Sequence, residues 1–297
     1  MLGLISCGEP RIVASKGDPE PMIAIQGYLL PQQPVNVLIT RNFALDPSVS
    51  ISKFDLLIED ASVVLEDLSQ GASYPLAYNP DTIVYEYAGD EDLSIVHGST
   101  YRLQVEATVG GQLLQASTTT TVPRPGFAVI EAQSRLGPLR YREREGGDDG
   151  ELQNFEIAFR RSPGIDFYVL SIKALDASAS TYIYDNSFTK NDSSDVRFFF
   201  RELVTAYEWG QSLPTDPDQE PVISTQSIRW RALQFYGRYR AIIYAADQNF
   251  KDFFLTHSTT QELDGNFHAP AFHIEGDGVG VFGSAIADTV FFEVLNE

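Results

Sequence analysis

The clearest pattern in the sequence is the alternation of apolar and polar residues between positions 100 and 109. Tyr101, Leu103 and Val105 alternate with polar residues, and this two-residue period is typical of a β-strand with one buried face. Gly110 and Gly111 follow directly, and a glycine pair at this place indicates a tight hairpin turn. The pattern therefore predicts two antiparallel strands joined by these glycines.

Further short segments rich in β-branched and aromatic residues, each bounded by turn residues, fill the first part of the chain. The predicted strands are Met22–Leu30, Val35–Arg41, Ser62–Leu68, Tyr74–Tyr78, Thr82–Tyr87, Thr100–Val109 and Gln112–Val122. Seven strands in about a hundred residues, without a helical period, predict an immunoglobulin-like β-sandwich over residues 23–122.

The segment Val122-Pro123-Arg124-Pro125-Gly126 interrupts this pattern, because two prolines cannot continue a paired strand. We place a domain boundary there and expect a second, larger β-sandwich domain over residues 127–297. Its predicted strands are Phe127–Ser134, Leu139–Arg144, Leu152–Arg160, Phe167–Ala174, Thr181–Tyr184, Val196–Leu203, Thr225–Phe235, Arg238–Ala245 and Gly280–Val294. The whole chain is thus expected to be all-β.

One helix interrupts the second strand series. Asp247 is a favourable N-cap, and Phe250, Phe253 and Phe254 recur after it at spacings of three and four. We therefore expect a short helix over residues 248–257 that packs one apolar face on a sheet.

The charge of the chain excludes two classes of partner. The 297 residues include 41 acidic and 21 basic side chains, for a net charge of −20. A field of this sign repels nucleic-acid phosphates and anionic lipid headgroups. No apolar run approaches the roughly 20 residues of a membrane-spanning helix, so membrane attachment would require an anchor.

Cys7 is the only cysteine, so an intrachain disulfide and a thiol cluster for zinc or iron–sulfur binding are impossible. The segment Leu4-Ile5-Ser6-Cys7 resembles a bacterial lipobox, whose cysteine is acylated. The apolar stretch is shorter than the about 7 to 15 residues of a signal peptide, so we infer a late start or a truncated chain. Residues 1–22 would form the lipobox and a proline-containing tether. The alternative is a free thiol in a frayed terminus.

Catalytic and phosphate-binding patterns are weak. A serine hydrolase elbow of the Gly-x-Ser-x-Gly kind is absent, and Gly283-Ser284 is better explained as part of a closely packed strand. The glycines of residues 276–280 lack the lysine and helix of a phosphate loop and indicate a hairpin. A glycosidase carboxylate pair cannot be selected among 41 acidic residues. We therefore assign no catalytic residue and expect no enzyme.

Metal and cofactor patterns are also weak. His268 and His273 could meet Asp264 and Glu275 in one loop, but their spacing matches no zinc motif. Three alternating carboxylates could hold calcium, although a solvated acidic loop explains them as well; they are Asp216, Asp218 and Glu220. We assign no metal ligand and no cofactor.

The most unusual local feature is the run from Ser227 to Arg240, which contains four arginines and four aromatic residues in an acidic chain. If Gln234 to Gly237 formed a turn, Arg231 would face Arg240 across a hairpin, and like charges opposite each other destabilise a sheet. Neighbouring carboxylates could neutralise these cations while Trp230 and Tyr239 fill the core. Otherwise a ligand or partner does so, with the following as weak contact candidates: Arg229, Trp230, Arg231, Arg238 and Arg240.

Several of these features occur together in one family. They are the lipobox, the strand Ile25-Gln26-Gly27-Tyr28, the aromatic helix after Tyr239–Asp247, Asp264-Gly265-Asn266-Phe267, and the glycine-containing segment 280–290. In this order they resemble the Bacteroidota outer-membrane lipoprotein family known as domain of unknown function 4249. The resemblance implies an N-terminal immunoglobulin-like or prealbumin-like domain, attachment to lipid through Cys7, and genes beside TonB-dependent transporters. It implies no catalytic residue.

These observations predict an accessory lipoprotein anchored in the outer membrane, at the cell surface or on the periplasmic face. It would bind a ligand or partner, which the resemblance suggests is a TonB-dependent transporter. The alternative is a carbohydrate-binding module or carbohydrate-active enzyme at the cell surface, in which Trp209, Trp230 and the many tyrosines stack on sugars. A third possibility is a purely structural surface module.

Overall fold

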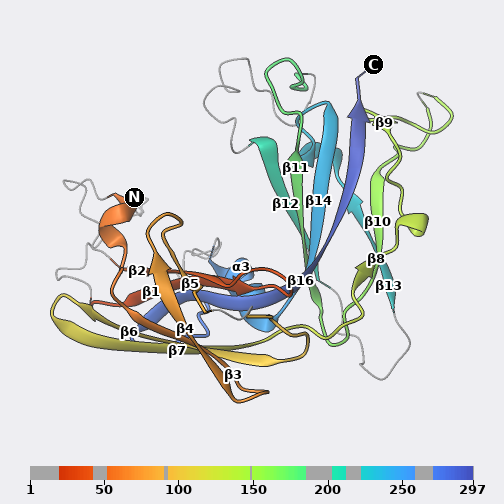
Figure 1. The fold of residues 1–297 in the computed structure, drawn as a ribbon. Coiled ribbons are helices and arrows are strands. Elements are labelled where there is room, and N and C mark those ends of the chain that lie inside the picture. The colour runs from red at the N-terminus through yellow and green to blue at the C-terminus, as the bar shows by residue number, and fades with distance from the viewer. Residues whose placement is uncertain are drawn as a thin grey trace, which may run out of the picture.

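The computed structural model describes residues 20–42, 52–89, 93–147, 149–184, 203–211, 222–257 and 270–296. These residues form two β-sandwich bodies that meet at a steep angle, and the strand β16 (Gly278–Leu295) runs through both (Figure 1). Hydrogen bonding joins most strands into one mixed sheet, and three others form a second sheet. The prediction of an all-β, sandwich-like fold is confirmed.

The first sandwich contains every strand that the sequence predicted for it. These strands are β1 (Ile23–Leu29), β2 (Asn36–Arg41), β3 (Ser62–Asp67), β4 (Ala72–Asn79), β5 (Val84–Tyr87), β6 (Thr100–Val109) and β7 (Gln112–Thr121). Burial alternates along them, and residues such as Ile25, Val37, Leu65 and Leu103 fill one core. The alternation placed these strands correctly because one face of each is buried.

The hairpin between β6 and β7 is also as predicted. Val109 pairs with Gln112, so Gly110 and Gly111 form a two-residue turn. Both glycines have positive φ, at 60° and 83°, and a turn of this kind requires φ > 0 at both central residues.

The second sandwich places two sheets face to face. One side contains β11 (Phe167–Ala174), β12 (Thr205–Gln211), β14 (Gly237–Ala246) and the second half of β16, in the order β12-β11-β14-β16. The other side is the sheet β13-β10-β8, built from β13 (Ile223–Ile228), β10 (Phe155–Arg160) and β8 (Ala128–Val129). Large aromatic side chains fill the core between them, among them Phe155, Trp230, Phe235, Tyr239 and Phe292.

Several predicted boundaries in this second region are wrong. Residues 127–134 and 139–144 form only the short strands β8 and β9 (Leu139–Arg140), and strand β10 begins at Phe155 rather than at Leu152. Residues 181–184 make a single bridge, between Tyr182 and Phe235. Of the predicted strand 196–203, only Leu203 lies within the described residues. Apolar residues in the bounding loops also pack into the core, so composition alone extended the predicted strands.

The glycines of residues 276–280 do not form the predicted hairpin. The strand β15 (Glu275–Gly276) pairs with β7, whereas Gly278 at the start of β16 pairs with Ile23 of β1. The chain therefore crosses between the layers of the first sandwich here, and Gly276 and Gly280, which adopt positive φ, allow the close approach of backbones.

The strand β16 belongs to both sandwiches. Its residues 278–284 pair in parallel with β1, and its residues 285–294 pair antiparallel with β14. Phe282 lies in the core of the first sandwich, whereas Val290 and Phe292 lie in the core of the second. One continuous strand thus fixes the two bodies to each other.

The helix α3 (Gln248–Thr256) begins where it was predicted. The Asp247 side chain accepts a hydrogen bond from the Phe250 N–H, which makes Asp247 the N-cap. Phe250 and Phe254 pack against Phe167 and Val169 of β11. The prediction that one face of this helix lies on a sheet is confirmed.

Candidate binding surface

The sheet β12-β11-β14-β16 has one face in the core of the second sandwich and one face directed away from that core. We call the second face the outer face. Its side chains follow from the register of the strands, because neighbours on one face recur every second residue. It includes Tyr207, Trp209, Val169, Lys173, Arg240, Ile242, Tyr244 and Phe291.

Three large aromatic side chains of the outer face are exposed. Tyr207 is 64% exposed, Trp209 51% and Phe291 61%. The adjacent residue Phe292 points the other way and is buried. Single exposed apolar residues are ordinary on protein surfaces, whereas a group of them on one face marks a binding surface.

The helix α3 covers only one end of the outer face. Ring contacts run from Trp209 to Phe167 at 5.9 Å, from Phe167 to Phe254 at 5.6 Å, and from Phe254 to Phe250 at 6.1 Å. Phe250 in turn contacts Tyr28 of the first sandwich at 5.0 Å. Trp209 therefore rests on a continuous aromatic layer, which holds its ring in place while leaving half of its surface to solvent.

The outer face also carries positive charge in an acidic chain. Lys173 and Arg240 are direct neighbours across β11 and β14, and Arg240 pairs on its other side with Phe291. Among the described residues neither cation has a carboxylate partner, and the buried Nε of Arg240 has no hydrogen-bond partner. Two adjacent like charges favour a negatively charged group beside them.

Tyr244 lies between these groups. Burial is the main cause that raises the pKa of its hydroxyl, and the nearby Tyr207 raises it further, whereas Arg240 lowers it. At neutral pH the tyrosine is protonated, so the outer face offers aromatic rings, a hydroxyl donor and two cations. Together these groups suit a partner with apolar and acidic side chains.

The strand β12 forms an edge of the large sheet, since β11 is its only partner within the described ranges. An edge strand leaves every second N–H and C=O free to pair with another extended chain. Glu208 points to the opposite side, where burial raises its pKa and the Arg229 N–H donates to its carboxylate at 3.5 Å. Tyr207 and Trp209 of β12 thus point to the outer face, whereas Glu208 between them does not.

The arginine-rich run is arranged differently from the expected hairpin. Arg231 lies in a 3₁₀-helix over Trp230–Ala232, and β14 pairs with β11 and β16, so Arg231 does not face Arg240. Trp230 is buried, and its indole N–H donates to the Gln153 carbonyl at 2.8 Å. The sequence predicted a hairpin because it could not reveal that β13 turns away to pair with β10.

The other arginines of the run have separate environments. Arg238 makes a bidentate contact with the Asp176 carboxylate, at 2.7 and 2.9 Å. A neighbouring carboxylate therefore neutralises Arg238, which agrees with the first of the two interpretations of the arginine-rich run. The charges of Arg229 and Arg231 lie near that of Glu208. Of the five candidate residues, Arg240 is the one that the structure brings together with the exposed aromatic side chains.

Sequence reasoning named Trp209, and the tyrosines as a class, as stacking residues, but it did not single out Tyr207 or Tyr244 and it missed Phe291. A usable signal existed, because Tyr207 and Trp209 are two residues apart and therefore share one face of a strand. Phe291 and Phe292 are adjacent in a strand, so their rings must point to opposite faces of the sheet, and one of them must point away from the core.

Chemical sites other than this surface receive little support. Groups of three or more potential metal ligands are absent from the described part of the chain. Cys7, Asp264, His268, Asp216, Asp218 and Glu220 lie outside it. Ser284 is fully buried and its hydroxyl donates to the Thr121 carbonyl at 3.0 Å. The interpretation of Gly283-Ser284 as part of a closely packed strand is therefore confirmed.

A groove of about 570 Å³ lies beside α3, lined by residues that include Arg102, Thr119, Asn249, Phe272 and His273. Two of its polar side chains already have partners, because Arg102 pairs with Glu66 and the His273 ring contacts the Asp252 carboxylate. The groove therefore offers a ligand fewer free groups than the outer face.

The fold and this surface define a class of protein, namely a two-sandwich β-protein with an exposed aromatic sheet face. The sequence matches the family described as domain of unknown function (DUF4249) over residues 10–287, and the chain belongs to that family. No curated protein is similar enough to count as a match. No helix of the described residues combines the length and apolar character needed to cross a membrane.

Two solved structures show limited similarity. A DUF4785 family protein from Legionella pneumophila is 10% identical, with a TM-score of 0.25, over 74% of this chain and 52% of that protein. The FN1–FN3 domains of chicken CNTN1 are 10% identical, with a TM-score of 0.18, over 89% of this chain and 65% of that structure. The chain thus spans less than two thirds of either structure, and neither similarity is strong enough to support a functional argument.

Proposed function

We propose that this chain is a non-enzymatic binding protein of the bacterial outer membrane, which holds a partner protein on its outer face. The observation that carries the proposal is the exposure of Tyr207, Trp209 and Phe291 on one sheet face beside two cations without carboxylate partners among the described residues. Aromatic residues and arginine dominate the energetics of protein interfaces.

The exposed aromatic rings offer apolar area that a partner can bury. Each aromatic side chain can bury about 150–250 Å², and burial of apolar area contributes roughly 25 cal/mol per Å². The three exposed rings could therefore supply several kcal/mol to binding, of which part is offset by the loss of translational and side-chain freedom. Trp209 has little freedom to lose because Phe167 already contacts its ring.

The partner that fits this surface is an extended segment with acidic and apolar residues. Such a segment could add by backbone hydrogen bonds to the edge of β12 that no described strand pairs with, while its carboxylates lie near Lys173 and Arg240. The net charge of −20 repels acidic chains elsewhere on the molecule, so the outer face would also set the orientation of binding.

Attachment to the membrane completes the proposal. Acylation of Cys7, which lies outside the described residues, would tether the two sandwiches to the outer membrane through a short linker. A TonB-dependent transporter is then the proposed partner, because the family resemblance suggests it. Replacement of Cys7 by Ser should release the protein from the membrane fraction, and mass spectrometry of the wild-type N-terminus should show acyl chains.

The binding surface can be tested in native outer membranes with a double variant, Trp209→Ala with Phe291→Ala. We expect at least about tenfold less TonB-dependent transporter to co-purify, since a loss of 1.4 kcal/mol already corresponds to tenfold. The matched control is Leu113→Ala, which removes a side chain that is 62% exposed on β7 of the first sandwich. Equal recovery of the transporter with both variants would contradict the proposal.

The single variant Trp209→Ala, with the same Leu113→Ala control, tests the carbohydrate alternative. The exposed rings of Tyr207 and Trp209 could stack on sugars, but they lie on a sheet face whose nearest charges are cations rather than a catalytic carboxylate pair. Binding of the wild-type protein on a glycan array, lost in Trp209→Ala and kept in Leu113→Ala, would favour that function. Loss of transporter binding without any glycan signal favours the protein partner.

A further inference from the structure

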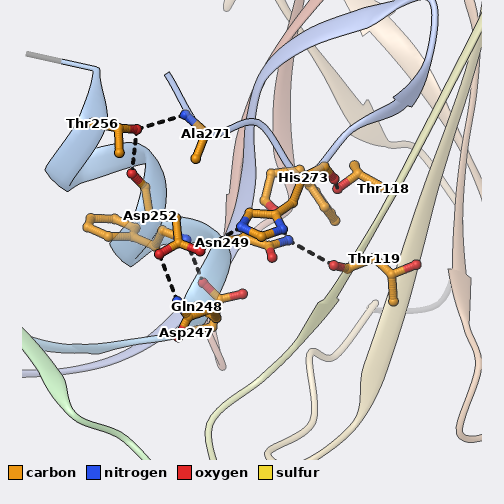
Figure 2. A network of polar contacts seen from close by, with 11 residues as sticks. Thr118, Thr119, Asp247, Gln248, Asn249, Asp252, Thr256, Ala271 and His273 are labelled. Carbon is orange, nitrogen blue, oxygen red and sulfur yellow. Dashed lines mark hydrogen bonds and ion pairs between the residues drawn. The ribbon is translucent and has the colours of Figure 1, made fainter. Parts of the chain in front are cut away.

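The two sandwiches are joined by polar contacts as well as by β16, at the place where β7, β16 and α3 meet. Figure 2 shows Asn249 of α3 beside Thr119 of β7, and its side-chain amide donates to the Thr119 and Phe282 carbonyls at 2.8 and 2.9 Å. His273 contacts the Asp252 carboxylate at 2.8 Å in the same view. We call this place the junction.

A chain of buried oxygen atoms runs through the junction. The Asp247 Oδ2 contacts the Thr120 hydroxyl, which lies 2.8 Å from the Ser284 hydroxyl, and the latter lies 3.0 Å from the Thr121 carbonyl. Asp247, Thr120 and Ser284 are all buried. These contacts link the end of β14 to β7 and β16, and so they link the second sandwich to the first.

The number of protons available for these three oxygen–oxygen contacts bears on the protonation state of Asp247. Three oxygen–oxygen contacts each need one proton, but the hydroxyls of Thr120 and Ser284 supply only two. The Thr121 carbonyl and an ionised Asp247 are acceptors only, so one contact would then lack a proton. If the Asp247 Oδ2 carries a proton, it donates to Thr120, Thr120 donates to Ser284, and Ser284 donates to the Thr121 carbonyl.

The surroundings of Asp247 also favour the neutral carboxyl. Burial is the largest effect on its pKa and raises it above the ordinary value of 3.8. The hydrogen bonds from Thr120 and from the Phe250 N–H, together with the charge of His273, act in the opposite direction but do not outweigh burial. The Tyr28 hydroxyl, on β1, is the other titratable group that faces this carboxyl.

We propose that Asp247 is protonated when the hydrogen bonds of the junction are formed, and that loss of this proton weakens the link between the two sandwiches. An ionised carboxylate there would be buried with neutral groups as its nearest partners, the Thr120 hydroxyl and the Phe250 N–H, which is costly. The stability of the junction would thus respond to pH.

The direction of the pH effect follows from linkage. The folded state holds this proton more tightly than the unfolded chain, so the unfolded chain binds fewer protons between 3.8 and the raised pKa. The contribution of Asp247 to stability is therefore complete below 3.8 and is lost as pH rises through its folded pKa. This is opposite to the behaviour of an ordinary surface carboxylate.

The test is Asp247→Asn in the full chain. The asparagine amide keeps the shape of a neutral carboxyl, and it can donate to Thr120 and still accept from the Phe250 N–H. We expect the melting temperature of the variant to match the wild type at acid pH and to exceed it increasingly as pH rises. Infrared spectra of the wild type at pH values above 3.8 should also contain a protonated-carboxyl band that the variant lacks.

The control is Asp252→Asn, which changes a carboxylate of the same helix that is more exposed and paired with His273. It should leave the protonated-carboxyl band in place. The proposal would be overturned if the wild type lacked this band, or if Asp247→Asn were less stable than the wild type by the same amount at every pH. The second result would mean that Asp247 acts as an ionised N-cap only.

Discussion

The two sandwiches use the same architecture but differ in what their sheets expose. In the first sandwich the outward positions of β6 are polar, with Arg102, Gln104 and Glu106, as expected for a solvated sheet face. In the second, the outward positions of β12 and β16 include Tyr207, Trp209 and Phe291, which are exposed. Folding requires only one buried face of each sheet, so the second sandwich carries apolar surface that its own core does not need.

The largest expected effect is the difference between alanine substitutions on the two faces of β16. Phe292 packs between Phe155 at 4.4 Å and Tyr239 at 5.2 Å, so Phe292→Ala should lower the free energy of unfolding by about 3–5 kcal/mol. Phe291→Ala on the opposite face should change it by less than about 1 kcal/mol. Urea unfolding of both variants measures this difference. Similar losses in both would show that the outer face is not solvent-exposed.

A second, smaller effect concerns the place where the sandwiches meet. A Cβ on Gly283 would lie 2.9 Å from the Asp247 Oδ1 and 3.1 Å from the Phe250 N. Gly283→Ala should therefore displace α3 and destabilise the protein by about 1–3 kcal/mol. Gly137→Ala, where no atom lies within 4 Å of the new Cβ, is the control. If thermal unfolding were equal for the two variants, the close packing of α3 on β16 would be in doubt.

The smallest expected effect concerns Asp176, a surface carboxylate whose pKa is shifted in the opposite direction to that of Asp247. Arg238 holds the pKa of Asp176 at about 2, below the ordinary 3.8, chiefly by a side-chain hydrogen bond. This contribution is present above 3.8 and is lost as pH falls through about 2. Asp176→Asn should therefore flatten the acid side of the stability profile and leave its alkaline side unchanged. Acid titration followed by circular dichroism checks this, and an unaltered acid slope would argue against the ion pair.

The fold of the first sandwich could be predicted because its strands alternate cleanly between core and solvent. In Thr100–Val109 the period alone identified the buried face. The second sandwich was predicted less well because both faces of several strands are apolar. In β11 the residues Phe167, Tyr168, Val169 and Leu170 are all buried, since α3 covers the face opposite the core. Alternation then vanishes, and strand ends cannot be placed from it.

The candidate site was predictable only in part. Trp209 was identified as a binding residue from its residue type, but the strand β12 around it was not predicted. Arg240 was selected for a contact across a hairpin that does not exist, and its actual neighbours Lys173 and Phe291 come from β11 and β16. Those neighbours are distant in sequence, and only the strand order brings them together.

The position of β16 after all the other strands of the two sandwiches has a consequence for how the protein is made. Because β1 needs β16 as one of its two partners, the first sandwich keeps an open edge until β16 has been synthesised. The sheet of the second sandwich waits for the same strand. Both bodies should therefore complete their folding together, once β16 is available, and nascent chains cut short before Gly278 should aggregate through the exposed edges of β1 and β14.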